Sequence, residues 1–157
     1  MLKKIVEMQA KKFCPGQFEV IKFASAAEAE NAFNKSKEQN EYVVALLVDK
    51  NMPLDFKEPC EYNDNTVAGY ELANRIRIQE KEIKENRRTI YLYSGDTIGK
   101  SPKMKIGGQD QDVDLIDGQY SKAGKIEIVG EFLKKAEETR NLLISEQILK
   151  PPGYIHT

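Results

Sequence analysis

The run Tyr42-Val43-Val44-Ala45-Leu46-Leu47-Val48-Asp49 is an unbroken series of hydrophobic side chains that ends on a carboxylate. A strand with one wet face alternates polar and apolar residues, whereas a continuous apolar run is typical of a parallel strand covered on both faces. The run therefore predicts a central strand of a parallel sheet, with Asp49 at its carboxyl end.

The rest of the chain alternates between helical and strand-like patterns. Helical spacing of apolar residues covers residues 1–13, 25–37, 69–86 and 126–143. Strand patterns cover residues 18–23 and 89–93, and a last strand is expected at either 113–116 or 119–122. The polar stretch 96–112 is expected to be a loop. Such alternation favours an α/β fold with a parallel sheet, although this chain opens on a helix.

Local signals mark the ends of these helices. Cys14-Pro15-Gly16 stops the first helix, because proline and glycine do not easily continue one. Ser25, followed by Glu28, forms a capping box at the start of the second. On the third helix we expect a solvated face made of charged residues, namely Glu80, Lys81, Glu82, Lys84 and Glu85.

Composition indicates an ordinary soluble domain. The 157 residues are 40% hydrophobic and 31% charged, and we divide them into a domain over 1–136 and a C-terminal helix end and tail over 137–157. The net charge of -1 predicts no nucleic-acid partner. Cys14 and Cys60 match no metal or redox spacing. Without a membrane-length apolar run or a signal-peptide core, we expect a cytoplasmic protein with no membrane partner.

Three polar residues follow strands whose carboxyl ends should meet at one edge of the sheet. They are Asp49, Ser94 and, after the last strand, Lys122. Ligands of open parallel sheets bind outside the carboxyl ends of the strands. A carboxylate can attack a phosphoryl group, while a hydroxyl and an ammonium hold its oxygens. The trio therefore predicts a site that handles phosphoryl groups.

The same residues carry a resemblance to a known family. Asp49 is followed by two residues and then Met52-Pro53, and Gly69-Tyr70-Glu71-Leu72 opens the next helix. Ser94-Gly95 ends one strand, and Tyr120-Ser121-Lys122 forms the next. In this order the motifs resemble the receiver domain of two-component response regulators, and the similarity extends over about residues 1–136.

The resemblance implies a flavodoxin-like doubly wound parallel sheet and a signalling role without enzymatic turnover. Asp49 would accept a phosphoryl group from a histidine kinase or a phosphotransfer protein. The Asp49 carboxylate and the Asn51 carbonyl would help to hold Mg²⁺, and Lys122 would bind the acylphosphate. Ser94 and Tyr120 would act as the switch that signals to a downstream protein target.

Four departures from the family pattern bear on that role. The family's first strand and its acidic, metal-binding pair have no counterpart, so we expect an incomplete Mg²⁺ site and poor phosphorylation. An exposed sheet edge should favour a homodimer. The segment 54–68 is an insertion, either a surface loop or a source of substitute ligands. The third departure is the stretch from Ser94 to Lys122, which is longer than is usual in the family, and the fourth is Ala123, which stands where a proline normally follows the lysine. Tyr120 lies two residues before Lys122 instead of the usual three.

Two other functions compete with a phosphorylated receiver. One is a pseudo-receiver, which keeps the fold as a protein-interaction module without phosphoryl chemistry. The other is a phosphatase of the haloacid-dehalogenase type, which uses a similar Asp, Ser and Lys. That class needs a second Asp as general acid where this chain has Asn51, and its late acidic residues follow the lysine, whereas the acidic residues here precede Lys122.

Overall fold

The structure is a computed structural model that describes residues 2–38, 42–49, 68–83, 88–94, 102–121 and 125–146. These segments form an α/β fold with four helices, a three-stranded parallel sheet and a separate two-stranded hairpin. The elements in chain order are α1 (Leu2–Phe13), α2 (Ala26–Glu38), β1 (Ala45–Asp49), α3 (Ala68–Ile83), β2 (Thr89–Ser94), β3 (Lys103–Ile106), β4 (Gln109–Asp114), β5 (Gly118–Ser121) and α4 (Lys125–Ser145).

The parallel sheet has the strand order β1-β2-β5. Ala45 of β1 aligns with Thr89 of β2, and Tyr91 of β2 aligns with Gly118 of β5. The expected parallel pairing is confirmed. Of the two ranges expected for the last parallel strand, 119–122 agrees with β5, whereas 113–116 overlaps the end of the hairpin strand β4. The expectation that β1 is central is wrong for the described sheet, in which β2 takes that position. Ile90, Tyr91 and Leu92 of β2 are buried, whereas the apolar side chains of β1 other than Val48 are half-buried.

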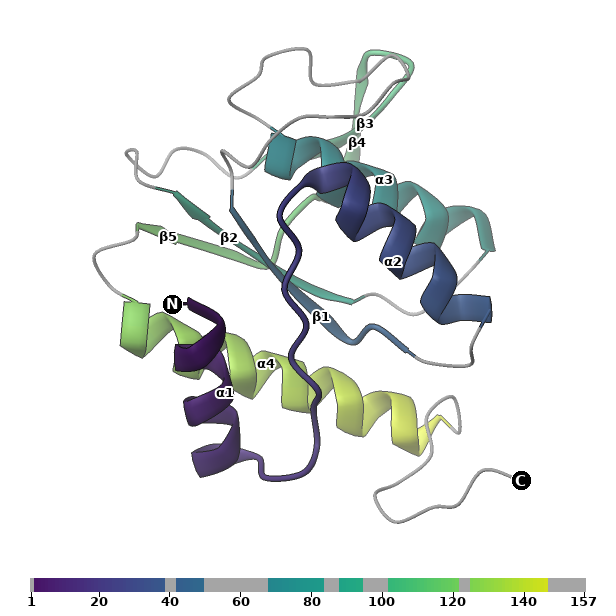
Figure 1. Cartoon of the computed structure of the whole chain (residues 1–157). Coiled ribbons are helices and arrows are strands. Elements are labelled where there is room, and N and C mark those ends of the chain that lie inside the picture. The colour runs from purple at the N-terminus through teal and green to yellow at the C-terminus, as the bar shows by residue number, and fades with distance from the viewer. Residues whose placement is uncertain are drawn as a thin grey trace.

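Helices cover both faces of the sheet, which gives three layers (Figure 1). On one face, Phe33 of α2 and Leu72 and Ile76 of α3 pack on Ile90 and Leu92 of β2. The other face, called here the α1–α4 face, buries a second cluster around β2, made of Val6, Ala10, Cys14, Tyr91, Val129, Phe132 and Leu133. The continuous apolar strands are thus explained by burial on both sides.

The helix boundaries follow the local signals. The helix α1 ends at Phe13, just before Gly16 adopts a positive φ of 74°. The Glu28 amide donates a hydrogen bond to the Ser25 hydroxyl at 3.3 Å, which confirms the N-cap of α2. None of the helices within the described segments is long and apolar enough to cross a membrane.

Residues 18–23 do not form the expected strand. They run extended from the α1–α4 face toward α2 and are not hydrogen-bonded into either sheet (Figure 1). Phe18 and Val20 pack against the cluster that also contacts Ala45 and Leu47, while Ile21 is 58% exposed. The alternating pattern therefore indicates only that one side of the segment is buried. A strand also needs a neighbouring strand to which its backbone can hydrogen-bond, and the pattern does not reveal whether one is present.

The segment expected to be a loop contains the hairpin of β3 and β4. Gly107 and Gly108 both have positive φ, 60° and 80°, which suits a two-residue turn of type I′. The Asn74 side chain on α3 holds the hairpin, because it accepts a hydrogen bond from the Lys105 amide and donates one to its carbonyl. Met104 is completely buried. A strand as polar as Gln109–Asp114 carries little hydrophobic signal, so the pattern missed it.

Candidate functional site

The parallel strands bring their carboxyl ends to one edge of the sheet. Asp49 is the last residue of β1, Ser94 of β2 and Ser121 of β5. Asp49 aligns with Tyr93, and Ser94 aligns with Ser121. The backbone positions of Asp49 and Ser94 therefore lie at neighbouring strand ends, as the sequence predicts. Lys122 follows Ser121 directly in the chain, but Lys122 and Asn51 lie outside the described residues, as do all residues of the insertion up to Val67.

Asp49 lies beside an aromatic residue at this edge. Its side chain is half-buried, and so is that of its strand neighbour Tyr93. Burial raises the pKa of the Tyr93 hydroxyl, and the negative charge of Asp49 raises it further. The sequence did not single out Tyr93, which became a candidate through its register with Asp49. The predicted switch residue Tyr120 aligns with Tyr93 in β5, so the three positions form one row across the sheet.

The metal-binding capacity of this edge rests on few ligands. Mg²⁺ prefers several oxygen ligands in near-octahedral geometry. Within the described segments, no group of three or more acidic, histidine or cysteine side chains is placed to hold a metal ion. Asp49 alone does not make a Mg²⁺ site, and the other predicted ligand, Asn51, is not among the described residues.

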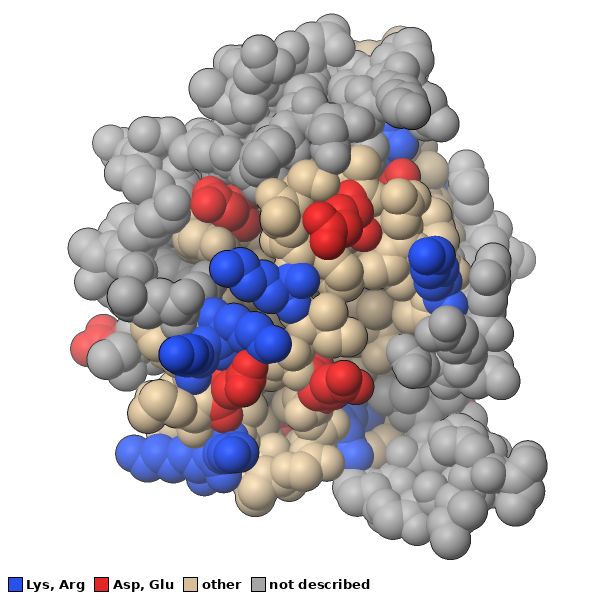
Figure 2. Space-filling view, in the orientation of Figure 1, with Lys and Arg blue, Asp and Glu red and all other residues tan. Residues whose placement is uncertain are grey.

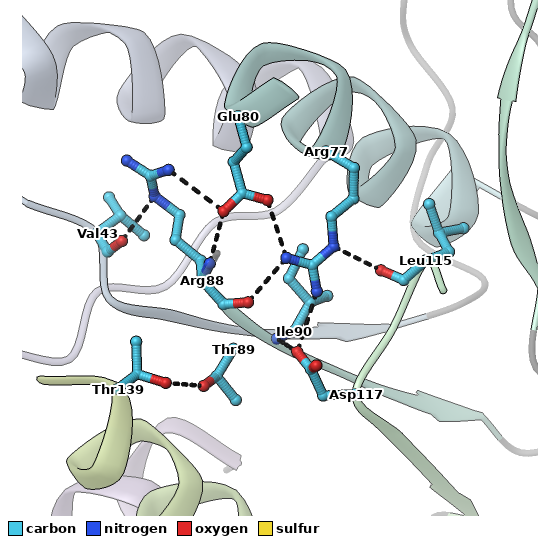
Figure 3. A network of polar contacts seen from close by, with 9 residues as sticks. All are labelled: Val43, Arg77, Glu80, Arg88, Thr89, Ile90, Leu115, Asp117 and Thr139. Carbon is cyan, nitrogen blue, oxygen red and sulfur yellow. Dashed lines mark hydrogen bonds and ion pairs between the residues drawn. The ribbon is translucent and has the colours of Figure 1, made fainter. Parts of the chain in front are cut away.

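The opposite edge of the sheet holds a buried charged network, shown in Figure 3. We call it the amino-edge network, and it consists of Arg77 and Glu80 on α3, Arg88 before β2 and Asp117 before β5. The Arg77 guanidinium donates to the Leu115 carbonyl and to the Arg88 carbonyl. It also contacts Glu80 at 2.9 Å and Asp117 at 3.0 Å.

Arg88 ties the network to β1 and α2. Its Nε donates to the Val43 carbonyl at 2.8 Å, and its guanidinium carbon lies 4.6 Å from the Phe33 ring centroid and 4.5 Å from that of Tyr42. The Arg88 amide donates to the Glu80 carboxylate. Glu80 is only 6% exposed, so its predicted place on the solvated face of the third helix is wrong. The two arginines supply the partners that make burial of its charge tolerable.

Among the described residues, the two best-formed hollows lie away from the carboxyl edge. Figure 2 shows acidic and basic side chains interspersed over the visible face. A hollow of about 320 Å³ lies between α1 and residues 16–20 and is lined by Lys3, Glu7, Lys11 and Glu19 among others. A second, of about 250 Å³, lies beside the amino-edge network, between Asp117 and Thr139. Both are lined by mixed charges, which favours no single class of ligand.

Comparisons with protein-family models, with curated proteins and with solved structures gave no match.

Proposed function

We propose that this chain is a receiver-type signalling module with a flavodoxin-like sheet, in which Asp49 is the phospho-acceptor. The observation that carries the proposal is the strand order β1-β2-β5. The carboxyl end at Asp49 lies beside the end at Ser94, and on the other side of β2 runs β5, the strand that precedes Lys122 in the chain. An acceptor carboxylate, a hydroxyl and an ammonium on three successive parallel strands suit transfer of a phosphoryl group to a protein carboxylate.

The roles follow from the chemistry of each group. The Asp49 carboxylate attacks the phosphorus of a phosphohistidine, the bond from phosphorus to the histidine nitrogen breaks, and an acylphosphate remains on Asp49. The Ser94 hydroxyl donates to a phosphoryl oxygen, and Lys122 offsets its charge. The donor is a histidine kinase or a phosphotransfer protein, and output passes through contact with a downstream protein.

A second candidate is a pseudo-receiver that binds a protein partner without phosphoryl chemistry. It is favoured by the ligand set around Asp49, which supplies one described carboxylate where Mg²⁺ prefers several oxygens. Phosphoryl transfer depends on cationic groups that balance the charge of the transferred group. A chain that cannot balance this charge could keep its protein-binding surface without accepting a phosphoryl group.

Beryllium fluoride with Mg²⁺ separates the two candidates, because it binds receiver aspartates as a phosphoryl mimic. For a phosphorylatable receiver we expect the amide resonances of Asp49, Ser94 and Lys122 to shift. The shifts should vanish in Asp49→Asn and survive in Asp112→Asn, which changes an exposed carboxylate on the hairpin. Unchanged spectra of the folded wild-type chain would support the pseudo-receiver.

A further inference from the structure

Tyr93 of β2 is the strand neighbour of Asp49. Asp49 and Tyr93 are aligned on adjacent parallel strands, and Tyr93 is aligned in turn with Tyr120. Neighbouring strands are about 4.8 Å apart, and aligned residues point to the same face of the sheet. The aligned row therefore leads from Asp49 across β2 to β5 at a single level of the sheet.

The face on which Tyr93 lies follows from alternation along β2. Ile90 and Leu92 belong to the cluster under α2 and α3, whereas Tyr91 belongs to the cluster on the α1–α4 face. Successive side chains of a strand point to opposite faces, so Tyr93 shares the face of Tyr91. At the carboxyl edge, Tyr93 therefore faces the layer that contains α4.

Two contacts show how α4 runs along β2. The Thr89 hydroxyl donates to the Lys135 carbonyl at 3.4 Å, and two residues further on the Tyr91 hydroxyl lies 3.3 Å from the Glu131 carboxylate, four helix residues earlier. Two strand residues advance by about 6.6 Å, which equals about four to five residues of an α-helix. One more such step places Tyr93 level with the first turns of α4, close to Glu127 and Ile128.

We propose that Tyr93 passes the charge state of Asp49 to the first turns of α4. This makes it a positioning residue rather than a catalytic one. The inference rests on the proposed function in one respect: phosphorylation of Asp49 is the event that would change the charge. Phosphorylation adds roughly one negative charge to an aspartate. Both side chains are half-buried, and a charge there is screened less than one in open solvent. Tyr93 is the residue of β2 that aligns with Asp49, so its aromatic ring is the neighbouring side chain on that strand.

The test compares charge removal in three backgrounds of the full chain at one neutral pH. Asp49→Asn is introduced into the wild type, into Tyr93→Phe and into Tyr91→Phe, with tyrosine ring carbons and backbone amides followed by NMR. In the wild type, Asp49→Asn should shift the Tyr93 ring signal and the amides of residues 125–129. The shifts at α4 should be lost in Tyr93→Phe and kept in Tyr91→Phe, whose hydroxyl contacts Glu131 instead.

Shifts at α4 that persist at full size in Tyr93→Phe would overturn the proposal, and so would their loss in Tyr120→Phe alone. If Tyr93→Phe does not fold, Tyr93→Leu takes its place, since it removes the whole ring. Beryllium fluoride distinguishes this inference from the proposed function. A wild-type chain that ignores the mimic contradicts the acceptor role of Asp49, whereas the comparison with Asp49→Asn still decides whether Tyr93 couples to α4.

Discussion

The two ends of the same three parallel strands differ in how they use polar residues. At the amino end, Arg77, Glu80 and Arg88 are at most 6% exposed and contact one another directly. At the carboxyl end, Asp49 and Tyr93 are half-buried. The carbonyls of Val43, Arg88 and Leu115 precede β1, β2 and β5, and each accepts a hydrogen bond from an arginine. The amino end therefore holds a buried network of charged side chains, whereas the carboxyl end holds the half-buried carboxylate for which we propose a phospho-acceptor role.

The largest effect on the free energy of unfolding is expected from removing Arg77 at the amino end. Arg77→Met removes the 2.9 Å partner of the buried Glu80 carboxylate and the guanidinium donor to the Leu115 and Arg88 carbonyls. Losing one member of a buried ion pair costs about 3–5 kcal/mol of the free energy of unfolding. Urea denaturation at pH 7 measures the loss. Lys135→Met is the control, because Lys135 and Glu138 form an exposed ion pair at the same i,i+3 spacing, and its loss should cost less than about 1 kcal/mol. Equal losses would contradict a special role for the network.

Tyr91 provides a test through pH. Burial, together with the charge of Glu131, raises its pKa from 10 to about 12. The folded state thus holds the proton more tightly than the unfolded state, so the stabilisation is complete below pH 10 and disappears as the pH rises to about 12. The free energy of unfolding should fall over that range by at most about 3 kcal/mol more in the wild type than in Tyr91→Phe. Parallel pH profiles for the two chains would refute the assignment.

Gly118 of β5 packs closely against the Tyr91 ring, which lies on the α1–α4 face. A Cβ at this position would lie 2.8 Å from the Tyr91 ring, which packs edge-on against Phe132. Gly118→Ala should therefore lower the free energy of unfolding by about 1–3 kcal/mol. Gly130→Ala is the matched control, because nothing lies within 4 Å of its Cβ and alanine favours a helix by about 0.5–1 kcal/mol. Thermal melts of the two variants should shift in opposite directions.

The smallest change in stability is expected at the carboxyl end of the strands. Asp49→Asn keeps the shape of a half-buried side chain, and substitutions outside buried networks usually alter stability by less than about 0.5 kcal/mol. Denaturation of this variant beside Arg77→Met measures the contrast between the two edges directly. A loss at Asp49 as large as that at Arg77 would mean that Asp49 is part of the structural framework.

Sequence patterns predicted the helices and the parallel strands because burial leaves a periodic trace. The Asp49 and Ser94 positions followed from the same patterns, since both residues end apolar strands. Contacts between distant segments leave no such trace. In the sequence Glu80 resembles a surface residue, but in the structure Arg77 and Arg88 contact its carboxylate. The hairpin is held to α3 by Asn74, whose side chain binds both backbone groups of Lys105.

The extended segment 18–23 shows a similar limit. Its side chains alternate as in a strand, but pairing requires a neighbour with free backbone groups at the right distance, and alternation contains no information about that. The position of Tyr93 next to Asp49 could not be predicted for a related reason. It depends on the alignment of two strands that are far apart in the chain.

Acceptance of a phosphoryl group at Asp49 is the central claim, and intact mass spectrometry after incubation with acetyl phosphate and Mg²⁺ tests it most directly. We expect the wild-type chain to gain the mass of one phosphoryl group, to lose it on treatment with hydroxylamine, and to show neither change in Asp49→Asn. A folded wild-type chain whose mass stays unchanged, or an Asp49→Asn chain that gains the same mass, would contradict the claim.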